Sequence, residues 1–148
     1  IYMDSSAYYC PCGAQWHRYL PPSLVRVDDT TLFSRRWELL VLSAAAVARL
    51  ATLPCLPRCR TVLLPQGAGL CLPVRQTVDC GLSRRSSLTL SSLSSPPVLC
   101  VQRRLTAVDG TPLEIQDIPL PCRWSHLPPE PLLLTAGAWL LTAASLPD

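Results

Sequence analysis

The chain contains neither lysine nor asparagine, and all thirteen of its basic residues are arginines. Without asparagine it has no acceptor for N-linked glycosylation. Folding physics does not require this bias, which is typical of a base-composition effect on the codons. The formal net charge of +3 over 148 residues is mild, so composition alone does not indicate a nucleic-acid-binding protein.

Long apolar runs are also missing. The longest one, residues 39–53, is interrupted by Arg49 and is shorter than the ~20 residues needed to cross a bilayer. The start of the chain has no basic segment followed by an apolar stretch and a small-residue cleavage site, as a secretory leader would have. We therefore expect a soluble, cytoplasmic protein with no membrane partner.

Cysteine is abundant, and it leaves two alternatives open. Eight cysteines could form the four disulfides of a non-enzymatic, secreted structural protein. They could equally be free thiols in a reducing compartment, which the missing leader pattern favours. The cysteines are at positions 10, 12, 55, 59, 71, 80, 100 and 122.

The chain divides into three segments that differ in amino-acid composition. Residues 1–22 are aromatic and cysteine-bearing and end at a Pro-Pro pair. Residues 23–59 read as a linker with one helix, predicted over residues 35–53 and ended by Pro54. Residues 60–148 consist of short apolar runs divided by Pro, Gly and Ser, so they form the main folded part.

Strands are the structure predicted for residues 60–148. Sixteen prolines and 49% hydrophobic residues suit short strands and turns better than long helices. Several runs alternate at period two, and Asp109-Gly110 between two of them is a hairpin-turn signal. The sequence therefore predicts a mainly β fold with a short helical or irregular N-terminal segment. The runs expected to form strands include 61–65, 87–93, 97–110 and 131–143.

Asp79 follows an apolar strand-like run and precedes Cys80 and Gly81. An aspartic protease needs two such carboxylates, which share a proton and activate one water between them. Glycine allows the two backbones to approach closely. One chain carries a single copy, so a second copy of the chain would supply the other carboxylate in a homodimer. An acidic turn residue is the alternative interpretation of the same tripeptide.

Three stretches together resemble a known family. "LCLPVRQTVDCGLS", "LTAVDGTPLEI" and "PLLLTAGAWLL", residues 70–83, 105–115 and 131–141, resemble in order and spacing the protease region of gypsy-type LTR retrotransposons, particularly the sushi-like elements. The resemblance covers roughly residues 60–145. It implies a small, closed β-barrel of the retropepsin type that cleaves polypeptide bonds as a homodimer and uses no cofactor.

The resemblance also implies roles for individual residues. Asp79 becomes the catalytic aspartate, with Cys80 and Gly81 in its loop. Residues 132–141 become the last core strand and the start of the following helix. The flap over the active site is formed by Thr106, Ala107, Val108, Asp109 and Gly110.

Several positions depart from the family's pattern. Cys80 stands where the family has Ser or Thr, and a thiol is a poorer hydrogen-bond donor, so we expect a weaker clamp between the two active-site loops. Ser86 and Ser87 stand where the family has an apolar pair, so we expect less apolar burial there. The resemblance therefore leaves two alternatives open, an active aspartic protease and an inactive descendant of one.

The N-terminal stretch "YYCPCGAQWHRYLPPS" is similar in outline to the zinc knuckle that precedes the protease in the same elements. Cys10, Cys12 and His17 are the candidate metal ligands, at imperfect spacing, whereas tetrahedral zinc takes four. Such knuckles bind single-stranded RNA, so RNA is a possible partner of residues 1–22, through Trp16 and its basic neighbours. A knuckle remnant that binds nucleic acid is thus a further alternative function.

Overall fold

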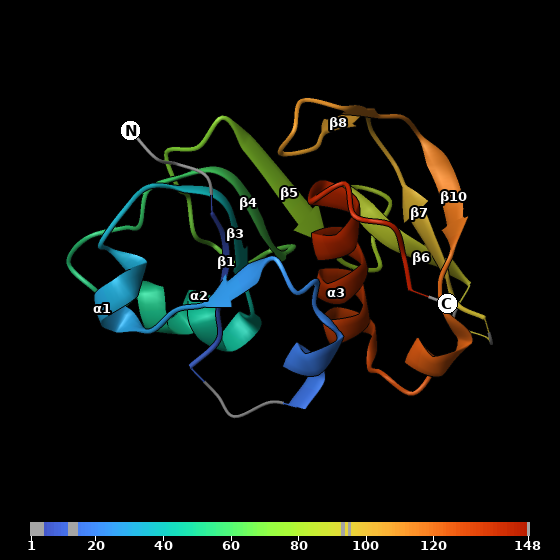
Figure 1. Cartoon of the computed structure of the whole chain (residues 1–148), viewed down its shortest axis with the longest axis horizontal. Coiled ribbons are helices and arrows are strands. Elements are labelled where there is room, and N and C mark those ends of the chain that lie inside the picture. Colours follow the sequence, from blue (N-terminus) through green and yellow to red (C-terminus); the bar gives the residue numbers. More distant parts are fainter. Residues whose placement is uncertain (1–4, 12–14, 93, 95, 148) are drawn as a thin grey trace.

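The computed structural model describes residues 5–11, 15–92, 94 and 96–147. Within these residues the main element is one open sheet of eight strands. They are β1 (Ser6–Tyr9), β2 (Leu24–Arg26), β3 (Trp37–Leu42), β4 (Cys59–Pro65), β5 (Gln76–Cys80), β6 (Leu88–Ser92), β7 (Val98–Val101) and β10 (Gln116–Pro119). Their order across the sheet is β10-β7-β6-β5-β4-β3-β1-β2 (Figure 1). Six of these strands, β1 to β6, run parallel to one another, whereas β7 is antiparallel to β6 and β10 is antiparallel to β7.

Helices pack against both faces of this sheet. One face lies against α3 (Pro129–Leu141), which contacts β3, β4, β5 and β6. The other face lies against α2 (Ala44–Leu50) and α1 (Asp29–Leu32), whose apolar side chains join a second core cluster. Figure 1 shows α1 and α2 grouped at one end of the molecule and α3 at its centre. Two short 3-10 helices, η1 (Gln15–Tyr19) and η2 (Cys122–Trp124), complete the helical part.

The prediction of a mainly β, closed barrel is wrong: the protein has a mixed α/β fold with an open, mostly parallel sheet. The reason lies in the central strands. Val62, Leu63 and Leu64 of β4 are all buried, and they belong alternately to the two core clusters. A strand covered on both faces reads as a continuous apolar run and is typical of a parallel sheet between helical layers. The eight-stranded sheet of this protein also contains strands from each of the segments 1–22, 23–59 and 60–148.

The helix predicted over residues 35–53 is in fact a strand followed by a short helix. Residues 37–42 form β3, and α2 begins only after Ser43, whose side chain accepts a hydrogen bond from the backbone N–H of Ala46 at 3.1 Å. Ser43 thus acts as the N-cap that separates the two elements. The opposite error occurs at 131–143, where the predicted strand lies in α3, after Pro129 at the first helical position.

Other strand predictions are confirmed. The run 61–65 lies within β4, and β6 lies within the run 87–93. The Asp109-Gly110 turn joins β8 (Leu105–Thr106) to β9 (Pro112–Leu113) in an antiparallel hairpin. Gly110 has φ of 91°, a left-handed conformation that favours glycine.

Gly137 lies where α3 approaches the sheet most closely. A Cβ atom at this position would lie 2.9 Å from Leu63 Cδ2 in β4 and 2.9 Å from Leu88 Cδ1 in β6. Both leucines are fully buried, so they have little room to move aside. The missing side chain therefore sets the distance between helix and sheet.

Candidate functional site

Asp79, the predicted catalytic residue, lies in β5 and is half-buried. Its Oδ1 accepts hydrogen bonds from the backbone N–H of Ser87 at 2.9 Å and from the Ser87 hydroxyl at 2.6 Å. Cys80 is buried among the core residues that face α3, and this burial raises the pKa of its thiol, with smaller contributions from Glu130 and Asp79. Within one chain, Asp79 therefore binds the residues that lead into β6.

The two serines that replace an apolar pair are buried but satisfied. Ser86 donates to the side-chain Oε1 of Gln66 at 2.5 Å. Ser87 donates to Asp79 and accepts from Arg103 Nε at 2.8 Å. Gly81 packs closely against this loop, since a Cβ there would lie 3.1 Å from Ser86 Oγ. In place of apolar side chains, the two serines therefore contribute to a hydrogen-bond network that links β5 to β6.

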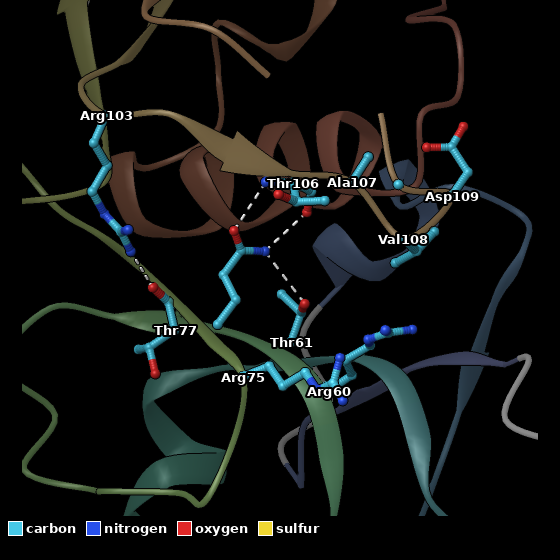
Figure 2. Close-up of a pocket in the computed structure, with 11 residues that line it drawn as sticks. Arg60, Thr61, Arg75, Thr77, Arg103, Thr106, Ala107, Val108 and Asp109 are labelled. Atoms are coloured by element: carbon cyan, nitrogen blue, oxygen red, sulfur yellow. Dashed lines mark hydrogen bonds between the residues drawn. The ribbon is translucent and has the colours of Figure 1, made fainter. Parts of the chain in front are cut away.

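The predicted flap residues line a cleft. Its volume is about 660 Å³, and the flap forms one wall (Figure 2). The opposite side comes from the first residues of β4 and β5, so the flap faces the amino ends of these strands, and Asp79 is not part of the lining. The lining residues of the described chain are Arg60, Thr61, Arg75, Gln76, Thr77, Arg103, Thr106, Ala107, Val108, Asp109 and Gly110.

Gln76 holds the flap hairpin to the sheet. Its Oε1 accepts from the backbone N–H of Thr106 at 2.9 Å, and its Nε2 donates to the carbonyl of Thr106 at 2.9 Å. The same Nε2 lies 3.3 Å from Thr61 Oγ1 in β4. The amide therefore pairs with β8 as a neighbouring strand would, and it keeps the cleft wall in place (Figure 2).

Three arginines from different elements line the cleft. Arg60 belongs to β4, Arg75 directly precedes β5, and Arg103 follows β7. Arg103 is held by Ser87 Oγ and by the carbonyl of Thr77, both of which are neutral acceptors. The three guanidinium groups give the cleft an excess of positive charge.

Little negative charge offsets these arginines. Glu38 lies 3.6 Å from Arg60. Asp109, the carboxylate in the lining, accepts hydrogen bonds from Thr111, which lower its pKa and keep it ionised. Arg75 has no ion-pair partner within the described part of the chain. A ligand in the cleft would therefore meet at least one uncompensated guanidinium group.

The predicted zinc ligands are only partly described. Cys10 is buried directly after β1, His17 lies in η1, and Cys12 lies outside the described residues. The His17 ring packs against Tyr8 and Trp16, and burial, with Arg26 nearby, lowers its pKa. Among the residues that the structure describes, no three His, Cys, Asp or Glu side chains gather as a metal site.

Most cysteines of the described chain are free thiols, so the four disulfides of the secreted alternative do not form in this structure. The free thiols are Cys55, Cys59, Cys71, Cys80, Cys100 and Cys122. In the described ranges, no helix combines the length and the apolar character needed to cross a membrane.

Comparison of the chain with protein-family models, curated proteins and solved structures finds no match. The arginines of the cleft and Gln76 were not predicted from the sequence, because each one is an ordinary polar residue beside a strand. A weak signal exists for Arg60, which precedes the predicted strand 61–65.

Proposed function

We propose that this protein binds a small anionic molecule, through a phosphate or carboxylate group, in the cleft between the flap hairpin and the amino ends of β4 and β5. The observation that carries the proposal is the convergence of Arg60, Arg75 and Arg103 on one cavity of about 660 Å³. This volume lies in the range of small-molecule sites.

Guanidinium chemistry supports an anionic ligand. An arginine side chain presents a planar fork of donors that matches the two oxygens of a carboxylate or phosphate. A cleft lined by charges of one sign also concentrates counter-ions. The hydroxyls of Thr61, Thr77 and Thr106 supply further polar groups around the same space. These features suit recognition of an anion and do not by themselves supply a reaction.

Calorimetric titration tests the proposal, with inorganic pyrophosphate and citrate as separate probes at low salt. Removal of one charge by Arg75→Gln should weaken binding about tenfold, since a charge-assisted hydrogen bond contributes about 1.5 kcal/mol. Arg123→Gln is the matched control, because Arg123 is exposed in η2, which follows β10 at the opposite end of the sheet. Equal affinity of the Arg75 variant and the unmodified protein would refute the proposal.

Aspartic proteolysis by a homodimer stays a prediction from the sequence. Its support is the Asp79-Cys80-Gly81 motif with the hairpin downstream. The mechanism requires the carboxylates of residue 79 from two copies to face each other, and in one chain Oδ1 of Asp79 is already engaged by Ser87. Pepstatin-sensitive peptide cleavage at acidic pH that disappears in Asp79→Asn is the expected result. Cleavage that survives this substitution would exclude Asp79 as the catalytic group.

A further inference from the structure

The arginines of this chain are not spread evenly over the fold. Because β3, β4 and β5 are parallel, their amino ends meet at one edge of the sheet, and the antiparallel β7 ends at the same edge. Six arginines lie just before, at the start of, or just after these strands. This group, the arginine edge, consists of Arg35, Arg36, Arg58, Arg60, Arg75 and Arg103.

Register places these residues side by side. The backbone N–H of Trp37 donates to the carbonyl of Arg58, and that of Arg75 donates to the carbonyl of Arg60. The backbones that carry Arg36, Arg58, Arg60 and Arg75 are therefore neighbours across three adjacent strands. With strands about 4.8 Å apart, the row from β3 to β5 covers about 10 Å before side-chain reach is added.

Charge compensation along this edge is sparse. Glu38 lies 3.6 Å from Arg60. The Cζ atom of Arg35 lies 5.3 Å from the centroid of the Trp37 ring. In the described part of the chain, Arg36, Arg58 and Arg75 have no carboxylate partner. Most of these arginines are exposed, so their like charges repel one another through solvent, and a polyanion along the edge would relieve that repulsion.

A small anion in the cleft can contact only the cleft arginines, whereas Arg35, Arg36 and Arg58 lie outside its lining. A linear polyanion would contact both groups. We propose that the arginine edge binds the phosphate backbone of a single-stranded nucleic acid, which enters the cleft and continues along the amino ends of β4 and β3. The inference rests on the proposed anion site, because the path of the strand includes that site.

Two features favour a single nucleic-acid strand. The cleft, at about 660 Å³, has the size of a site for one small molecule, so it admits one nucleotide chain and not a duplex. Threonine hydroxyls accompany the arginines in the lining, and such groups contact phosphate and sugar oxygens in nucleic-acid complexes. Contacts of this kind position the strand and carry no sequence information, so binding should be independent of sequence.

Fluorescence anisotropy with a short labelled oligouridylate, measured between 50 and 200 mM salt, tests the inference on the full chain. About four neutralised phosphates predict a slope of log K against log salt of about −3, which is a loss of about 50-fold over this range. The double variant Arg36→Gln/Arg58→Gln should reduce the slope to about half. Arg123→Gln, at the opposite end of the sheet, should leave the slope unchanged, and circular dichroism checks that each variant is folded.

The outcomes separate this inference from the proposed function. Pyrophosphate binding without oligouridylate binding would overturn the nucleic-acid inference and leave the anion site standing. If neither pyrophosphate nor oligouridylate binds, the nucleic-acid inference and the proposed anion site are both refuted. Oligouridylate binding with the same slope in the double variant would also overturn the inference. A heparin fragment that binds more tightly than an oligonucleotide of equal charge would show that the occupant is another polyanion.

Discussion

The hairpin that walls the cleft is tied to β5 by the side chain of Gln76, and replacing this side chain should loosen that wall without unfolding the protein, because Leu105 and Leu113 stay packed in the core. Gln76→Ala removes both hydrogen bonds to the backbone of Thr106 and the weaker contact with Thr61. Each neutral hydrogen bond contributes about 1 kcal/mol net. Since Thr106 is exposed, we expect a local loss of about 1.5 kcal/mol, which corresponds to about a tenfold larger population of the open hairpin.

Amide hydrogen exchange measured by NMR reports this loss directly. The Thr106 N–H is protected by the Gln76 side chain, so its exchange should accelerate at least tenfold. The Ala107 N–H donates to Thr111 within the hairpin at 2.9 Å, so it should change much less if the hairpin itself persists. Pyrophosphate affinity should fall in parallel, because Thr106 to Gly110 form the displaced wall.

Gln102 offers a matched control. It is also half-buried, and its Nε2 donates to the carbonyls of Ser83 and Ser86, away from the hairpin. Gln102→Ala should therefore leave Thr106 exchange unchanged. If Thr106 exchanges at the same rate in the Gln76 variant as in the unmodified protein, the side chain does not anchor the hairpin and the reasoning fails.

Two further predictions concern the core. Gly137→Ala should lower the free energy of unfolding by about 1 kcal/mol in urea denaturation, because overpacking costs about 2 kcal/mol and alanine returns about 1 in helix propensity; a more stable variant would contradict the close contact with the sheet. Burial raises the pKa of Cys59 to about 12, so at pH 8 iodoacetamide should modify the exposed Cys55 and leave Cys59 unmodified until the protein unfolds, as peptide mass spectrometry would show. Equal rates of modification at Cys55 and Cys59 would contradict this prediction.

Local signals in the sequence were reliable where one or two residues decide the structure. The Asp109-Gly110 turn forms its hairpin, because the left-handed conformation at Gly110 is a local property of glycine. The runs at β4 and β6 were also found, since apolar segments of five to seven residues between turn residues are too short for most helices. Pro54 was placed correctly beyond the end of a helix, although that helix is shorter than predicted.

The errors share one cause. Residues 39–42 and 131–141 are both mainly apolar, and periodicity cannot distinguish a strand covered on two faces from a buried helix. The first run lies between two parallel strands and became β3, whereas the second lies across the sheet and became α3. Whether such a run pairs as a strand within the sheet or packs over the sheet as a helix depends on partners far away in the sequence.

The sequence by itself determined the Asp109-Gly110 turn and the strands β4 and β6, because these follow from backbone conformation and short-range patterns. Tertiary structure alone decided the parallel sheet and the cleft. Arg60, Arg75 and Arg103 are separated along the chain and share no local pattern. They meet because parallel pairing aligns the amino ends of β4 and β5 and the antiparallel β7 ends beside them, and only that long-range pairing turns scattered charges into one site.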